Sequence, residues 1–225
     1  MAKENFKKED EQLENVGEAL NTAGLWIEAH QNLLFGIVIA IAAVILGCIA
    51  LNNYVIKPHA LEASNENAKA VEYFMQGQWE TALNGDDAEC IGFLAVADEY
   101  AMYQQGELAN LYAGICYYQL GQYEESAACL KKFSADDVMI NPASYQLLGD
   151  AYVQMGELEK ALKAYDASIK SNNDLLSPMS LKKAGLVYLE LDKKANAKKC
   201  FEQIRDNYPQ SQEAQDIEKY ISLAQ

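Results

Sequence analysis

Three consecutive segments of the chain repeat one pattern of small and bulky residues, with a period of 35 to 36 residues. Each segment has a glycine followed three places later by a tyrosine, as in Gly114–Tyr117, Gly149–Tyr152 and Gly185–Tyr188. A small residue comes twelve places after the glycine, and a bulky one follows four places later. The small positions hold Ser126, Ala161 and Ala197, and the bulky positions hold Leu130, Tyr165 and Phe201. Self-similarity at this period is typical of solenoids, in which each unit packs only against its neighbours.

The spacing is the signature of the tetratricopeptide repeat (TPR), whose units each fold into two antiparallel helices. Small residues in both helices of a unit allow the two helices to approach closely. The aromatic and bulky residues fill the space between successive helix pairs. Gly121 and Gly156 follow the first helix of their units, where a left-handed cap is expected, and Asp192 takes this place in the third unit. We therefore predict an all-α fold with TPR units at residues 107–141, 142–177 and 178–210.

Weaker forms of the pattern flank these units. Residues that fall at the matching offsets are Ala70, Tyr73, Gly77, Trp79 and Ala82. Residues 57–106 are therefore expected to form degenerate TPR-like helices, including one from about Cys90 to Tyr103. Apolar residues on one side of a helix at 211–225 predict a capping helix that shields the last pair from water.

The segment Leu33–Leu51 holds 19 residues without a charge, and the uncharged stretch extends over residues 31–56. As a helix, the segment would span roughly 28 Å, close to the hydrocarbon thickness of a bilayer. We predict a transmembrane helix at 31–56, against the alternatives of a buried core helix or a signal peptide. Residues 1–30 carry three lysines and seven acidic residues, which predicts an acidic amphipathic segment or a poorly ordered tail.

The orientation of this span stays open from the residues alone. Lys57 and Lys69 follow the apolar run and no lysine or arginine closely precedes it, which favours a cytoplasmic C-terminal side. Cys48 lies in the span, and four further cysteines without CxxC spacing fit a reducing compartment. Two of them, Cys129 and Cys200, occupy equivalent repeat positions and are predicted to be packing residues.

TPR solenoids carry ligands on the face formed by the first helix of each unit. Only Lys182 is cationic among the corresponding positions, which disfavours a lysine-based clamp for a terminal carboxylate. The remaining positions predict an apolar groove for an apolar or amphipathic protein segment. The alternatives are a shallow groove or one filled by the protein's own helices. The candidate groove residues are Leu108, Leu111, Ile115, Tyr118, Asp150, Val153, Lys182, Leu186 and Leu189.

The charge balance excludes several function classes. A net charge of −15 and a single arginine, Arg205, oppose nucleic-acid binding. The sequence has no phosphate-binding loop, metal-ligand spacing or catalytic motif, so we predict no enzyme activity, cofactor, metal site or small-molecule substrate. Residues 57–130 hold 2 lysines against 12 acidic residues, which predicts an acidic face for a basic partner or a solvated surface.

The combination of an acidic N-terminal segment, one span and these repeats resembles the YfgM-type family of single-pass inner-membrane TPR proteins, ancillary to the Sec translocon. The stretches that look like the version in Bacteroidetes-type bacteria are Ala82–Asp86, Gly92–Leu94, Leu108–Gly114 and Gly149–Tyr152. The resemblance implies a bacterial inner-membrane scaffold with periplasmic repeats that link translocon subunits, chaperones or client segments. The alternative is a cytosol-facing anchored receptor for chaperone-bound clients.

Overall fold

The computed structural model describes residues 25–26, 28–86 and 89–225. The predicted acidic segment at 1–30 therefore lies almost entirely outside the described residues. The prediction of an all-α fold is confirmed, because every regular element in the described part of the chain is a helix. The chain divides into two compact units, residues 1–58 and 59–225.

The first unit contains α2 (Gln31–Leu51) and the π-helix η1 (Asn52–Ile56). The described residues contain one helical stretch that, by length and composition, could cross a membrane. The apolar side chains of α2 are exposed, with Val38, Ile39 and Leu46 each more than 60% accessible. The π-helix lies just before Pro58, which has no N–H to donate. In it the N–H of Lys57 donates to the carbonyl of Asn52, five residues back.

The second unit starts at His59, within α3 (Lys57–Met75), and continues with α4 (Trp79–Asn84) and α5 (Gly92–Glu99). The helix expected from Cys90 to Tyr103 is shorter than predicted. Gly106, in the helix that follows, packs closely against the end of this segment, because a Cβ atom there would lie 2.2 Å from the carbonyl oxygen of Tyr100. These helices share a core that includes Ala70, Phe93 and Val96, and Cys116 of the next helix packs into it.

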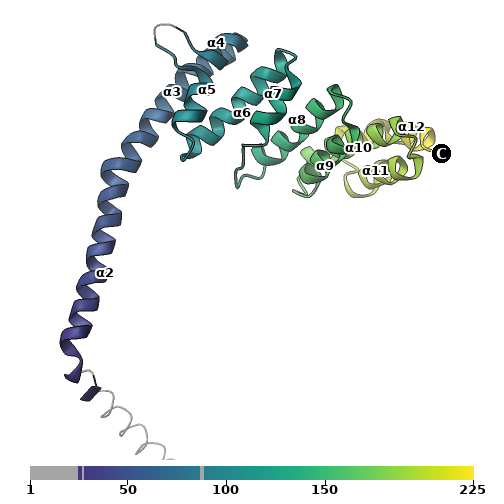
Figure 1. The fold of residues 1–225 in the computed structure, drawn as a ribbon. Helices are drawn as coiled ribbons and strands as arrows, with labels where there is room; N and C mark the ends of the chain where they lie inside the picture. Colours follow the sequence, from purple (N-terminus) through teal and green to yellow (C-terminus); the bar gives the residue numbers. More distant parts are fainter. Residues whose placement is uncertain (1–24, 27, 87–88) are drawn as a thin grey trace, which may run out of the picture. The chain divides into compact units, whose positions relative to one another are not determined.

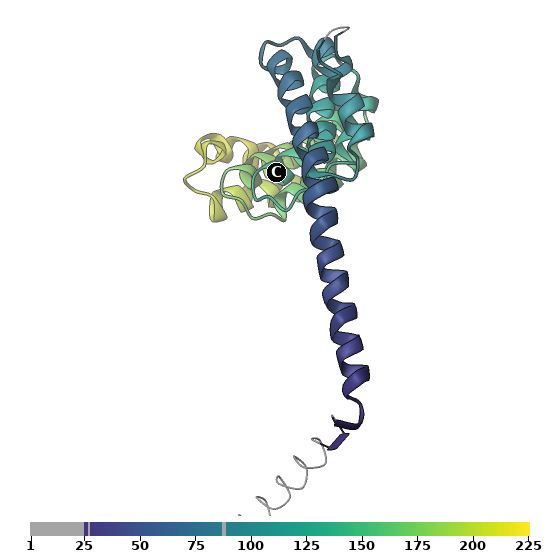
Figure 2. The same cartoon turned by 90° about the vertical axis from the view of Figure 1, so that its left-hand side faces the viewer.

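Three helix pairs follow along the chain, and the first helices of successive pairs contact one another (Figure 1, Figure 2). The pairs are α6 (Gln104–Gln119) with α7 (Tyr123–Leu130), α8 (Ile140–Gln154) with α9 (Leu158–Ile169), and α10 (Leu176–Glu190) with α11 (Lys194–Asn207). The short 3-10 helix η2 (Gln212–Asp216) and α12 (Ile217–Leu223) close the unit and bury Ile217 and Ile221 against the last pair.

Close approach within a pair depends on the repeated glycines. A Cβ atom on Gly149 would lie 2.4 Å from Cε1 of Tyr165, and one on Gly185 would lie 2.3 Å from Cε1 of Phe201. The predicted role of the glycine and the bulky residue in helix packing therefore has a direct geometric basis.

Candidate protein-binding groove

Two predicted groove residues, Leu111 and Ile115 of α6, line a hollow of about 480 Å³ beside α8. Ala143 and Leu147 of α8 and Leu176 of α10 complete most of its wall. Ser144 is the polar side chain in its lining. Its hydroxyl donates a hydrogen bond to the carbonyl of Asn141, so the donor is already satisfied within the protein. We name this site, with Met139 and Ile140 at its edge, the apolar hollow. It has the surface chemistry that accepts apolar side chains.

Asp137 positions the edge of the apolar hollow. Its Oδ1 accepts hydrogen bonds from the backbone N–H groups of Met139 and Ile140 at 2.8 and 2.6 Å. These bonds satisfy free donors at the start of α8 and lower the pKa of the Asp137 carboxyl. They hold two apolar side chains near the surface, where Met139 is 41% and Ile140 43% exposed.

Asn173 likewise accepts hydrogen bonds from backbone N–H groups at the start of α10. Its Oδ1 accepts from the N–H groups of Leu175 and Leu176 at 2.9 and 3.0 Å. Its Nδ2 donates to the carbonyl of Val138 at 2.9 Å, across to the loop before α8. The two inter-repeat loops are thereby joined, and their apolar residues gather at one place.

Asp150, a predicted groove residue, is engaged within the solenoid. Tyr165 donates its hydroxyl to Oδ1 of Asp150 at 2.7 Å, and Lys183 forms an ion pair with Oδ2. The carboxylate therefore connects α8 with α9 of its own repeat and with α10 of the next one. Burial, reinforced by Asp150, raises the pKa of Tyr165.

The other predicted groove residues lie outside the lining of the apolar hollow. Leu108, Tyr118 and Val153 are partly buried against the central core, and Leu189 packs against the C-terminal core. Lys182 pairs with Asp216 at 2.8 Å and lies over the Tyr220 ring, so it joins α10 to the terminal helices. Leu186 is 44% exposed. The structure thus brings two of the nine predicted residues, Leu111 and Ile115, into the apolar hollow.

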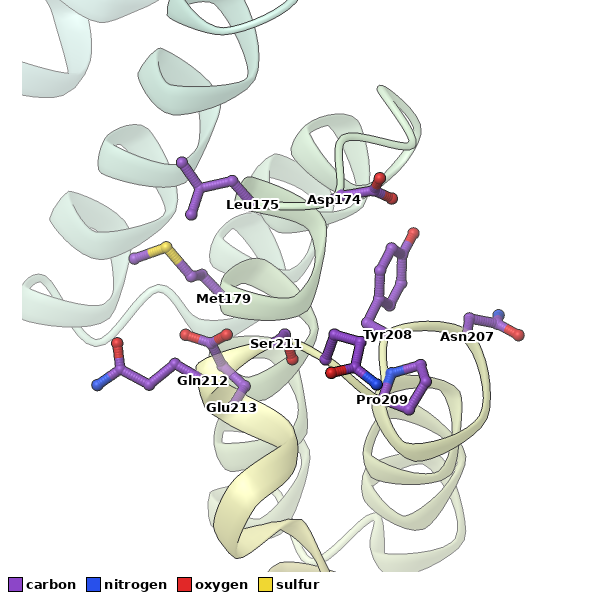
Figure 3. A pocket seen from close by; sticks show the side chains of 10 residues that line it. Asp174, Leu175, Met179, Asn207, Tyr208, Pro209, Ser211, Gln212 and Glu213 are labelled. Carbon is purple, nitrogen blue, oxygen red and sulfur yellow. The ribbon is translucent and has the colours of Figure 1, made fainter.

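A second hollow of about 550 Å³ lies between the start of α10 and the segment that follows α11. Figure 3 shows Leu175 and Met179 on one side of it and Tyr208 and Pro209 on the other. Asp174 and Glu213 supply carboxylates, and we name this site the acidic hollow. The repeat pattern did not predict this hollow, because most of its lining comes from the segments before α10 and after α11.

The thiols of the solenoid are unsuited to nucleophilic chemistry. Burial raises the pKa of Cys116 to about 12 and that of Cys200 to about 11, so both remain protonated at neutral pH. Cys129 is buried as well, and burial raises its pKa. The described residues contain no group of three or more His, Cys, Asp and Glu side chains arranged to hold a metal ion.

The helix pairs form an α-solenoid whose first helices carry the apolar hollow. Family models of the tetratricopeptide repeat match residues 108–136, 142–175 and 181–211, so the repeating units are TPRs. No curated protein matches the chain.

Two solved structures have a similar fold. Both are crystal structures of a putative kinesin light chain with nearly identical TPR-like repeats from Podosopora anserina, and one of them is of a form with a single substitution. Each is 14% identical, with a TM-score of 0.54 over 74% of this chain and 86% of the other. At this identity the likeness concerns the solenoid fold alone.

Proposed function

We propose that the protein is a membrane-anchored scaffold that binds segments of other proteins in the apolar hollow. The TPR repeats indicate a protein-interaction scaffold. The observation that carries the proposal is the apolar wall formed by Leu111, Ile115 and Leu147 on the first helices of successive repeats. Burying the apolar side chains of a partner there would contribute roughly 25 cal/mol for each Å² removed from water.

The proposed anchor is α2. Its exposed apolar side chains favour hydrocarbon over water, and it contains no charged residue. Anchoring confines the solenoid to the membrane surface and raises its effective concentration for partners there. A groove of modest affinity then suffices for recruitment.

The architecture's resemblance to YfgM-type proteins supports translocon subunits, periplasmic chaperones or their clients as partners. In this proposal the protein lies in a bacterial inner membrane, with its N-terminus in the cytoplasm and its repeats in the periplasm. Large downstream domains are translocated largely regardless of local charge, so the lysines after the span are compatible with this orientation.

In-cell crosslinking with mass spectrometry tests the proposal through Ile140→Asp. Ile140 lines the hollow at the first position of α8, where an acidic residue is compatible with the helix. The substitution places a charge in the apolar hollow, so we expect the wild-type partners to be lost from the crosslinked set.

Ser134→Asp is the matched control, because Ser134 is exposed in the loop before α8 and is not part of the hollow's lining. Thermal unfolding of both variants shows whether the fold is intact. An unchanged partner set for a folded Ile140→Asp variant would contradict groove binding.

A further inference from the structure

The apolar hollow and the acidic hollow meet at adjacent residues. Leu176 lines the first and Leu175 lines the second, both at the start of α10. Asn173 fixes this junction through hydrogen bonds to the N–H groups of both leucines. A single bound segment that crosses the junction can therefore contact both hollows.

The surface around the junction is unusually apolar for a solvated loop. Val138 is 77% and Leu175 60% exposed, beside the 41% and 43% exposed side chains of Met139 and Ile140. Contiguous exposed apolar residues of this kind mark interaction sites. A partner that covers these side chains would remove their apolar surface from water, which would stabilise the complex.

The two hollows differ in the charge they would accept. The apolar hollow is lined by aliphatic side chains and one internally bonded serine. The acidic hollow adds the carboxylates of Asp174 and Glu213, and no lysine or arginine lines it. Within the described part of the chain, neither carboxylate forms an ion pair. The acidic hollow is therefore complementary to a cationic side chain.

We infer that the partner is an amphipathic, cationic protein segment. Its apolar side chains occupy the apolar hollow, and a lysine or arginine near one end enters the acidic hollow, where Asp174 and Glu213 supply carboxylates. The inference rests on the proposed function and specifies the partner's chemistry.

Fluorescence anisotropy on the full chain in phosphatidylcholine nanodiscs tests this with three synthetic peptides. The first carries leucines in one half and lysines in the other. The second has glutamine in place of every lysine, and the third has serine in place of every leucine. We expect the leucine–lysine peptide to bind most tightly, and empty nanodiscs measure adsorption to lipid.

The double variant Asp174→Asn with Glu213→Gln removes the two carboxylates with little change in shape. We expect it to weaken binding of the leucine–lysine peptide by roughly threefold to tenfold, as for two partly exposed charge pairs. The glutamine peptide should be unaffected. Raising the salt from about 0.1 M to about 1 M shortens the screening length from ~10 to ~3 Å, so it should remove the lysine advantage.

Glu159→Gln with Glu190→Gln is the matched control, because it removes the same charge from exposed positions outside both hollows. Equal binding of the lysine and glutamine peptides, or equal loss in both double variants, would overturn the inference. Such a result would leave the proposed function intact if Ile140→Asp still abolished crosslinking in cells. The crosslinking experiment thus tests whether the apolar hollow binds partners, and the peptide experiment tests whether the partner is cationic.

Discussion

At the scale of single residues, the close pairing of helices depends on glycines that face a ring. The Cβ of an alanine at 149 or 185 would overlap the aromatic carbons of Tyr165 or Phe201. Tyr165 and Phe201 are among the most deeply buried side chains of the described residues, so neither ring can move without disturbing its neighbours. At Gly114 the atoms that would be met belong mainly to the Leu130 side chain, which has more rotameric freedom.

We expect Gly149→Ala and Gly185→Ala each to destabilise the chain by about 1–3 kcal/mol through overpacking. This cost is net of a helix-propensity gain of about 1 kcal/mol for alanine over glycine. Gly114→Ala should cost less, because a leucine yields more readily than a buried ring. Urea unfolding of the full chain in detergent measures all three, and equal losses at the three sites would contradict this account.

The buried thiols predict a pH dependence of stability. Burial raises the pKa of Cys200 to about 11, whereas an unfolded cysteine ionises near about pH 8.5. Below about pH 8.5 both states are protonated and the contribution of the buried thiol to stability is fully present. As the pH rises towards 11 the unfolded state loses protons first, so stability falls by about 1.4 kcal/mol per pH unit for this group.

Cys200→Ala isolates that contribution from the lysines, which also titrate in alkaline solution. The variant should gain stability relative to the wild type as the pH rises from about 8 to about 11. Unfolding free energies across this range provide the measurement. Parallel pH profiles for the two proteins would show that the Cys200 thiol is not shielded from ionisation.

At the scale of elements, the repeat period made the helices predictable, because small and bulky residues recur wherever two helices must meet. Leu111 and Ile115 line the same hollow because one helix face carries both, and their role in binding a protein segment stays a prediction. Met139, Ile140 and Leu175 were missed because they lie at inter-repeat loops, where no periodicity constrains them. The bonds of Asp150 were also missed, since its partners Tyr165 and Lys183 come from two other helices.

The turn after the first helix of each repeat also follows from the sequence. Gly121 and Gly156 adopt φ values of 76° and 71°, as expected for left-handed caps, and Asp192 adopts 55° in the third repeat. A residue with a Cβ atom is destabilised by roughly 1–2 kcal/mol in the left-handed region, and aspartate by less than most. Glycine has no Cβ atom and adopts this region without that cost. The third repeat therefore has a less favourable cap than the first two.

Asp192→Gly should stabilise the chain by about 0.5–1 kcal/mol. The reverse change, Gly156→Asp, should destabilise it, because Gly156 has a φ of 71° and an aspartate there would carry the cost of the left-handed region. Thermal unfolding of the two variants provides the measurement. A lower unfolding temperature for Asp192→Gly would mean that the aspartate carboxylate contributes more than the backbone strain costs.

At the scale of the whole molecule, native cysteines cannot report the side of the membrane on which the solenoid lies. Cys90 is 2%, Cys116 0% and Cys129 7% exposed, and Cys200 is partly buried with a raised pKa. Thiol reagents attack the thiolate, so labelling of these residues reflects burial rather than compartment. A topology experiment needs a cysteine at an exposed position.

Ser134→Cys supplies one, because Ser134 is exposed in the loop between α7 and α8. If the repeats are periplasmic as proposed, a membrane-impermeant maleimide added to intact cells should label Ser134→Cys and leave the wild type largely unlabelled. Asn5→Cys, on the other side of the span in sequence, is the matched control and should be labelled only after lysis. The opposite pattern, with Asn5→Cys labelled in intact cells and Ser134→Cys only after lysis, would place the groove in the cytosol. The partners would then be cytosolic clients, and the proposed link to periplasmic chaperones would be wrong.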